Sequence, residues 1–252
     1  MRVGLELEVD GRAVRIERAV PRGPTAAVKL LPLLRDLSGA IVARASAQAS
    51  AMGQPVTCRE ACAACCRQLV PVGRAEAERL REFVAAMPAK RRAGVLARFR
   101  AAQAEMRSAG LDRLREPARM SDGERARDAR GDYGAVGLLY QRSHIDCPFL
   151  ADERCAIYPE RPLACREHLV TSAPEHCGRP ELPGVEGLGT DGLVFEALAA
   201  IDAPAGAEPD WIPLPYALEW VPAPRSRPGT GPELFHRALA ALRPRRLEPA
   251  AS

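Results

Sequence analysis

The sequence predicts a mainly α-helical protein with an N-terminal β-hairpin and an irregular cysteine-rich core. Apolar residues recur at helical spacing through much of the chain, and the apolar–polar alternation that predicts strands is confined to the N-terminus. All eight cysteines fall in two clusters, and prolines within the second cluster argue against long regular elements there. With 252 residues, the chain can bury a sizeable core without covalent crosslinks.

The first segment, residues 1–22, is predicted to be a β-hairpin. Apolar residues alternate with polar ones on both sides of Asp10-Gly11, a dipeptide typical of two-residue hairpin turns. After two prolines, apolar positions at helical spacing predict a long helix over residues 26–52, and Pro32 is expected to delay its start.

The second segment, residues 23–178, is predicted to be a helical domain that holds both cysteine clusters. Apolar stripes predict a pair of helices over residues 74–87 and 89–109, joined at Pro88. The stretch near residues 110–132 is charged and poor in apolar anchors, and we interpret it as an insertion.

The third segment, residues 179–252, is predicted to be a proline-rich wrap with two helices. One short amphipathic helix is expected over residues 193–201 and a last helix over residues 233–242. Thr230 and Pro232 give the start signals of that last helix.

Composition and charge narrow the class of protein. Hydrophobic residues make up 47% and charged residues 27% of the chain, as in ordinary soluble proteins. The formal charge is only +4 and no basic stripe is interleaved with aromatic residues, so we expect no nucleic-acid partner. The N-terminus does not resemble a secretory signal, and no apolar run approaches the ~20 residues that span a bilayer. We therefore expect no membrane partner and a cytoplasmic location, where clustered thiols favour metal binding over disulfides.

The first cluster contains four cysteines within nine residues: Cys58, Cys62, Cys65 and Cys66. Thr57 and Glu60 have the pattern of a capping box, which predicts a helix with all four thiols on one face. Adjacent cysteines do not easily bind one compact tetrahedral ion. Cys66 therefore has three interpretations: a ligand of a second centre, a support for the first centre, or a small buried apolar residue.

The second cluster contains four cysteines within 31 residues: Cys147, Cys155, Cys165 and Cys177. It includes Cys-Pro-Phe-Leu from residue 147 and Cys-x-Ile-Tyr-x-x-Arg-Pro-x-x-Cys-Arg over residues 155–166. Together with the Cys-x3-Cys-x2-Cys-Cys pattern of the first cluster, these motifs resemble the YkgJ-like cysteine-cluster family, a zinc- or iron-chelating domain. The resemblance covers roughly residues 56–178 and implies a metal-binding core.

All eight cysteines are candidate metal ligands, because thiolates bind both zinc and iron–sulfur clusters. Arg161 and Arg166 are expected to donate to loop carbonyls or to offset the charge of the thiolates. Tyr158 is expected to pack beneath the centre or to donate to a sulfur. Three histidines flank the second cluster and are alternative ligands: His144, His168 and His176.

An iron–sulfur cluster is the preferred cofactor and zinc is the alternative. Structural zinc sites usually use paired Cys-x2-Cys motifs, whereas three nearby cysteines with distant partners suit a larger cluster. Eight thiolates would satisfy two four-cysteine centres, and seven would leave one labile position or a spare redox thiol. Both arrangements stay open.

The predicted function is chelation of an iron–sulfur cluster or zinc, with redox activity in the former case. One alternative is an iron–sulfur-dependent enzyme, either one using S-adenosylmethionine through its Cys-x3-Cys-x2-Cys spacing or, by family analogy, a lysine N-methylase-like methyltransferase. Another is a structural zinc fold for protein interaction, with Trp211, Tyr216 and Trp220 as a docking surface. The sequence identifies no catalytic residue and no particular protein partner.

Overall fold

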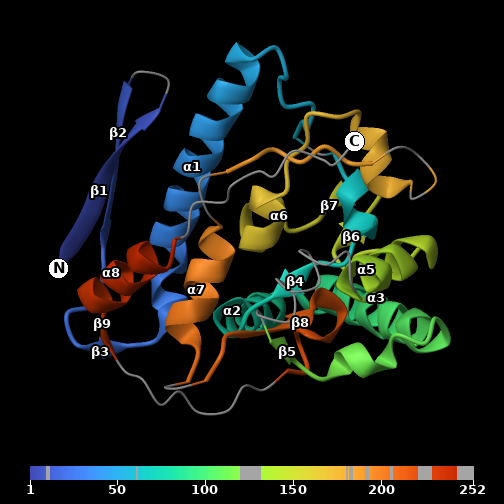
Figure 1. Cartoon of the computed structure of the whole chain (residues 1–252). Helices are drawn as coiled ribbons and strands as arrows, with labels where there is room; N and C mark the ends of the chain where they lie inside the picture. The colour runs from blue at the N-terminus through green and yellow to red at the C-terminus, as the bar shows by residue number, and fades with distance from the viewer. Residues whose placement is uncertain are drawn as a thin grey trace.

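The structure is a computed structural model that describes residues 1–9, 12–60, 62–119, 132–179, 181, 184–190, 193–204, 207–220 and 229–242. It confirms the mainly α-helical class with an N-terminal hairpin (Figure 1). The α-helices are α1 (Leu31–Ala51), α2 (Arg74–Ala85), α3 (Ala89–Ser108), α5 (Asp132–Arg142), α6 (Leu163–Glu167), α7 (Val194–Asp202) and α8 (Gly231–Ala241).

Short 3-10 helices and strands connect these helices. The 3-10 helices are η1 (Ala27–Leu30), η2 (Ala64–Arg67), η3 (Asp112–Arg115), η4 (Tyr158–Glu160), η5 (Pro174–Gly178) and η6 (Leu214–Tyr216). The strands are β1 (Arg2–Val9), β2 (Arg12–Ala19), β3 (Pro24–Thr25), β4 (Pro71–Val72), β5 (Ala118–Arg119), β6 (Leu150–Ala151), β7 (Arg154–Cys155), β8 (Asp210–Pro213) and β9 (Gly229–Thr230). They form small antiparallel sheets in the orders β1-β2, β3-β9, β4-β8-β5 and β6-β7.

The N-terminal hairpin pairs β1 with β2 in register, with Leu5 opposite Ile16. A Cβ added at Gly4 would lie 2.4 Å from the carbonyl oxygen of Ile16, so this close approach requires glycine. The expected turn at Asp10 and Gly11 lies outside the described residues.

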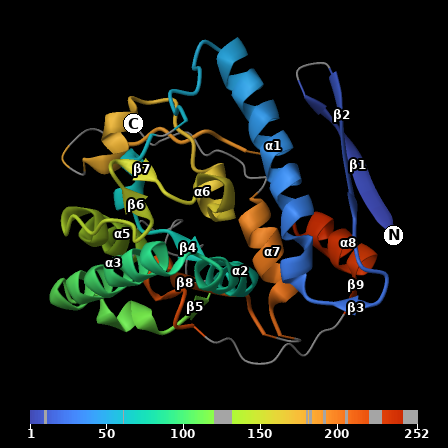
Figure 2. The same cartoon turned by 180° about the vertical axis from the view of Figure 1, so that it is seen from behind.

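A first buried core contains residues from the early and the late parts of the described chain. Ile16 of the hairpin, Leu34 of α1, Phe195 of α7 and Phe235 of α8 belong to one buried cluster. Figures 1 and 2 show the hairpin, α1, α7 and α8 together on one side of the molecule. Burial of this apolar surface therefore ties the last helix to the first.

Residues of α2, α3 and α5 contribute to a second buried core. The rings of Phe99 and Phe149 meet edge to face, with centroids 5.2 Å apart. Tyr140 and Tyr216 are fully buried in the same cluster. Cys147 and Cys155 are among the residues that pack against it, so the second cysteine cluster begins at the edge of this core.

The helix predictions were accurate for α2, α3, α7 and α8 to within a few residues. The expected helix over 26–52 begins later, at Leu31, after the 3-10 turn η1. Pro32 occupies its first turn, where a missing N–H costs nothing. Most of the expected insertion, residues 120–131, lies outside the described residues.

The aromatic docking surface suggested by the sequence is wrong. The exposed fractions are 4% for Trp211, 1% for Tyr216 and 8% for Trp220. These rings are core residues, because β8 lies between β4 and β5 and η6 follows it directly into the second core.

Two buried carboxylates hold the short helix α6 and its neighbour. Oε1 of Glu76 accepts a hydrogen bond from the amide of Leu163 (2.7 Å), at the start of α6. The carboxylate of Glu167, in α6, accepts from the amides of Val194 (2.9 Å) and Phe195 (3.3 Å), at the start of α7. Since helix starts leave amides without partners inside the helix, these bonds fix where α6 and α7 begin.

An ion-pair network also attaches the segment of the second cysteine cluster to the neighbouring helices. Glu160 of η4 pairs with Arg35 of α1 and Arg79 of α2, each at 2.9 Å. Burial alone would raise the pKa of Glu160, but the two guanidinium groups outweigh it and lower that pKa. The loop before α6 is thus tied to both cores.

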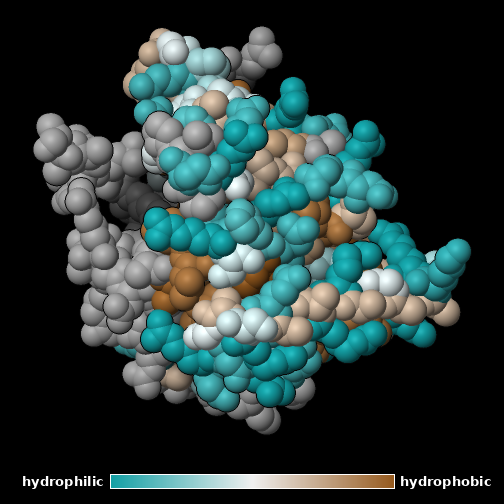
Figure 3. Space-filling model, turned by 90° about the vertical axis from the view of Figure 1, so that its right-hand side faces the viewer, coloured by the Kyte–Doolittle hydropathy of each residue, from teal (hydrophilic) through white to brown (hydrophobic). Residues whose placement is uncertain are grey.

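The described surface in Figure 3 is mostly hydrophilic, with apolar side chains showing between the polar ones. Among the described helices, none is long and apolar enough to cross a membrane.

Glu76 generates a prediction about pH and stability. Burial raises the pKa of Glu76 from 4.5 to about 7, so the folded protein binds a proton that the unfolded chain releases at lower pH. The stability that this proton binding gives the folded state is complete below about pH 4.5 and is lost as the pH rises to about 7. Glu76→Gln keeps an acceptor for Leu163 but does not ionise.

We expect the free energy of unfolding of the wild type to fall by about 1 to 3 kcal/mol more than that of Glu76→Gln over this interval. Denaturant unfolding at a series of pH values measures it. Glu105→Gln, an exposed change on α3, is the matched control. Parallel pH profiles for wild type and Glu76→Gln would contradict the prediction.

Candidate metal centre

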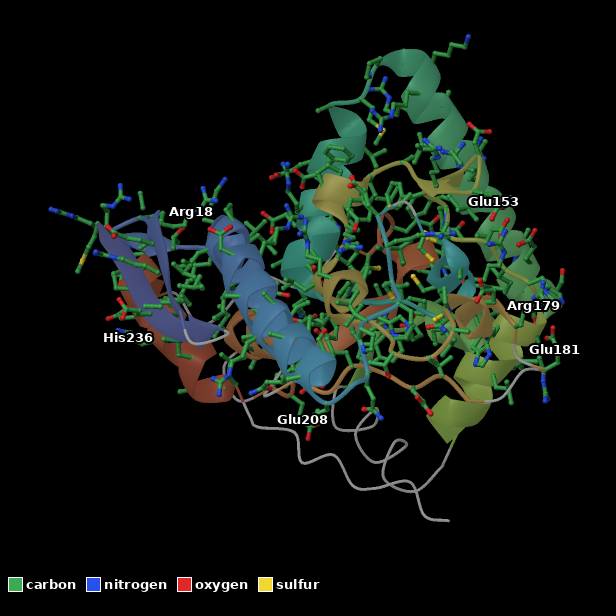
Figure 4. The ribbon with its side chains drawn as sticks, turned by 90° about the horizontal axis from the view of Figure 1, so that it is seen from above. Arg18, Glu153, Arg179, Glu181, Glu208 and His236 are labelled. Atoms are coloured by element: carbon green, nitrogen blue, oxygen red, sulfur yellow. The ribbon has the colours of Figure 1, made fainter. Side chains whose placement is uncertain are left out.

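The two cysteine clusters come together in space. The first lies in the segment between α1 and β4, and the second lies in the segments around β6, β7, α6 and η5. Figure 4 shows several sulfur atoms gathered in the middle of the molecule, inward of Glu153 and Arg179. His236, on α8, lies on the opposite side of the molecule from Glu153 and Arg179.

The helix predicted to carry the first cluster does not form. Thr57 is not a helix cap: its amide donates to the carbonyl of Val170 (3.0 Å), and its hydroxyl donates to the carbonyl of Ser172 (2.5 Å). Residues 58–60, 62 and 63 are non-helical, and only the 3-10 turn η2 follows. The prediction failed because a partner more than 100 residues away binds the groups that would have started the helix.

Direct contacts join the first cluster to the second. The amide of Cys147 donates to the carbonyl of Cys66 at 2.8 Å. The side chain of Cys66 acts on the pKa of Cys65, and the side chain of Cys147 acts on the pKa of Cys66. Cys66 therefore interacts with residues of both clusters.

Two glutamines attach Cys177 to the same region. The side-chain amides of Gln68 and Gln141 each donate to the carbonyl of Cys177, both at 2.9 Å. Gly178 lies against Ala64, since a Cβ there would be 3.3 Å from the Ala64 carbonyl oxygen. The sequence analysis missed both glutamines; Gln141 follows an apolar run just before the cluster, whereas Gln68 gives no signal.

The non-cysteine residues of the second cluster anchor its loop. Phe149 and Ile157 are buried in the second core, and the carbonyl of Phe149 accepts from the amide of Ala156 (2.9 Å). Between them, Asp152 and Glu153 adopt positive φ angles of 50° and 53°, which reverse the chain between β6 and β7. This turn brings Cys155 back towards Cys147.

The three accessory residues lie together beside the centre. The guanidinium of Arg161 stacks on the ring of Tyr158, 4.2 Å from its centroid. Arg166 donates to the carbonyls of Arg161 (3.1 Å) and Pro159, so it supports the loop backbone. Nε of Arg161 is buried and has no hydrogen-bond partner among the described residues, and the charge of Arg161 acts on Cys58 and Cys155.

The cysteine environment favours protonated thiols in the metal-free protein. Hydrogen bonding to Cys66 and burial raise the pKa of Cys65, and hydrogen bonding to Cys147 is the first cause that raises the pKa of Cys66 to about 12. Burial is the largest cause that raises the pKa of four others: Cys58, Cys155, Cys165 and Cys177. A metal that binds here must displace protons, so its affinity should rise with pH.

The histidines differ in their relation to the centre. Nε2 of His168 lies 3.9 Å from Sγ of Cys177, and burial lowers the pKa of His168, which keeps the ring neutral. Nδ1 of His176 is buried, and no hydrogen-bond partner for it lies within the described part of the chain. His144 adopts a φ of 52° at the end of α5.

The cysteine thiols are donors of the kind that soft metals bind, although their side chains do not point to one common centre. All eight cysteines are free thiols. Within the described residues, no three His, Cys, Asp or Glu side chains are arranged so that they could already hold an ion. Binding therefore requires thiols to turn between rotamers, which the loops and short turns of this region allow.

A mainly helical chain that gathers eight free cysteines in one irregular region belongs to the class of cysteine-cluster proteins. Residues 57–178 match the family model described as "CxxCxxCC: Putative zinc- or iron-chelating domain", the family that includes the YkgJ-like proteins. Residues 57–178 therefore carry the domain of this family, and the resemblance seen in the sequence is confirmed over them. No curated protein and no solved structure matches the chain.

Arg161 generates a second prediction. Its charge lowers the pKa of Cys58, Cys65 and Cys155 against the larger effects that raise it. Arg161→Gln should raise the pKa of these thiols, because it removes a positive charge that favours the thiolate. Ultraviolet thiolate absorbance of the metal-free protein, followed against pH, measures the change.

Arg161→Lys keeps the charge and loses the planar stacking on Tyr158, so its titration should stay close to that of the wild type. Arg179→Gln removes an exposed charge near Cys177 in sequence and is the control. If Arg161→Gln titrates like Arg179→Gln, Arg161 does not act on the thiols through its charge.

Proposed function

We propose that this protein chelates an iron–sulfur cluster through its cysteine thiolates, with zinc as the alternative occupant. The observation that carries the proposal is the contact between the clusters, in which the Cys147 amide donates to the Cys66 carbonyl at 2.8 Å. Thiols distant in sequence gather in this way where they share a metal.

The arrangement of the donors supports iron–sulfur over zinc. Structural zinc sites use compact pairs of knuckles, whereas here the later cysteines come from four separate segments. A larger inorganic group would bridge such dispersed donors with less movement of the backbone than a single ion. When bound, an iron–sulfur cluster supplies one-electron transfer, and zinc supplies stabilisation of the fold.

The chain's own residues would support the group in distinct ways. All eight cysteines are the proposed metal ligands, Arg161 offsets the negative charge of thiolates, and Arg166 holds the loop carbonyls. Tyr158 orients Arg161 through stacking. A reducing, cytoplasmic location is part of this proposal, because eight free thiols persist there.

The enzyme alternatives gain no specific support. In the described part of the chain, the first cluster follows α1 and is followed by a two-residue strand, not by the strand–helix alternation of a partial barrel.

The decisive experiment is elemental analysis with an optical spectrum of protein purified without oxygen. Broad visible absorption with iron and sulfide supports the cluster, whereas colourless protein with zinc supports the alternative. Protein that binds neither metal after reconstitution would contradict the proposal. Adding S-adenosylmethionine to the loaded protein then tests the enzyme alternative, through a change in the spectrum.

A third prediction concerns Cys62→Ser. Since metal binding contributes to folding, this variant should bind less metal than the wild type, with affinity reduced by about tenfold or more, and should unfold at a lower temperature when loaded. Metal content and thermal unfolding measure the two effects.

Val170→Ala is the matched control, because Val170 is fully buried beside Cys58 but supplies no thiol. It should lose on the order of 2 kcal/mol from the cavity while it keeps its metal. Full metal content and unchanged stability in Cys62→Ser would remove Cys62 from the ligand set.

A further inference from the structure

We propose that His168 is a positioning residue that holds the sulfur of Cys177 through a hydrogen bond from its Nε2. His168 begins a short non-helical segment, residues 168–170, which is called the support segment from here on. The inference rests on the proposed function and adds a group, other than the thiols, that fixes where one ligand sulfur lies.

The support segment contacts one sulfur from each cysteine cluster. Nε2 of His168 lies 3.9 Å from Sγ of Cys177, which belongs to the second cluster. The amide of Val170 donates to Sγ of Cys58, which belongs to the first cluster, at 3.4 Å. Contacts of this kind from the groups around a metal centre orient its ligands. Two donors that are two residues apart thus serve sulfurs from distant parts of the chain.

Backbone hydrogen bonds hold the support segment on both sides. On one side, the carbonyl of Val170 accepts from the amide of Thr57 (3.0 Å). On the other side, the carbonyl of Leu169 accepts from the amide of Leu188 (2.7 Å). The first amide of the segment donates to the carbonyl of Ala164 in α6 (3.1 Å). A segment fixed in this way can impose a position on the side chain that it contacts.

The sulfur of Cys177 depends on a protein group for its position. The backbone of Cys177 is already fixed, because Gln68 and Gln141 both donate to its carbonyl. Cys177 is 3% exposed, so water has little access to the sulfur. Rotation about χ1 is then the main freedom of this side chain, and the contact with His168 limits that rotation.

The chemistry of the pair makes the imidazole the donor. A metal binds the thiolate of Cys177, which carries no hydrogen. A hydrogen bond between the two side chains then requires a hydrogen on Nε2 of His168, because a neutral imidazole carries a hydrogen on only one of its nitrogens. A nitrogen that carries this hydrogen has no lone pair for a metal. Through Nε2, His168 therefore supports a ligand and does not act as one.

The test compares two substitutions and uses cobalt(II) as the probe metal. His168→Leu removes both ring nitrogens, whereas His168→Gln keeps an N–H group close to the position of Nε2. The wild type is measured first. If it shows no charge-transfer band from thiolate to cobalt, the proposed function fails and this inference fails with it.

If the wild type shows the band, we expect His168→Leu to bind cobalt about tenfold more weakly. Its band should move to longer wavelength, because a sulfur without a hydrogen-bond donor gives up its electrons more readily. His168→Gln should keep the band and the affinity of the wild type. His236→Leu, an exposed change on α8, controls for cobalt that is bound by a histidine alone.

The inference is overturned if His168→Leu keeps the wild-type band and affinity, or if His168→Gln loses as much affinity as His168→Leu. In both cases the proposed function survives, because the wild type still binds metal.

A second measurement observes the wild-type ring directly, in zinc-loaded protein, and does not depend on how well His168→Leu folds. Nitrogen–hydrogen correlation spectra of isotope-labelled histidine show which ring nitrogen carries the hydrogen. The signals that His168→Gln lacks identify the ring of His168. We expect the hydrogen on Nε2. A hydrogen on Nδ1 alone would overturn the inference, since Nε2 would then be an acceptor or a metal ligand.

Discussion

The structure depends on bringing eight cysteine sulfurs together from loops and from very short elements, instead of from long helices or a large sheet. Helices and strands satisfy their own amides and carbonyls, whereas loops must find other partners when they are buried. The contact between Cys66 and Cys147 brings two such loops together. The buried amides and carbonyls near these two residues then need hydrogen-bond partners from other segments, and this requirement explains much of the surrounding sequence.

Arginine side chains supply many of those partners. Arg91 donates to the carbonyl of Ala156 (2.7 Å), Arg98 to that of Pro148 (2.9 Å), and Arg35 to that of Glu160 (3.2 Å). A guanidinium suits this role because it offers several donors and stays charged. Several arginines of the chain therefore hold the backbone of the cysteine loops.

The sequence predicts what depends on local pattern and misses what depends on distant partners. The apolar spacing in α3 and the start signals of α8, where Thr230 and Glu233 form a capping box, identify both helices. The equally plausible box at Thr57 fails, because the hydroxyl and amide of Thr57 bind carbonyls of residues 170 and 172. The cysteines themselves could be named as candidate ligands from spacing alone. Their grouping around Cys65 and Cys66 could not, since it depends on how η5 packs on η2.

The attachment of α6 shows how a metal centre here can stabilise the whole chain. This helix has only five residues, too few to be stable alone, yet it carries Cys165. Glu76 of α2 binds its first amide, and its own Glu167 binds the first amides of α7, which packs in the first core. A shift of Cys165 would therefore disturb the starts of two helices and two buried carboxyl groups at once. A displacement of Cys165 is thereby transmitted to both cores through hydrogen bonds that cannot be lost singly without leaving a buried polar group unsatisfied.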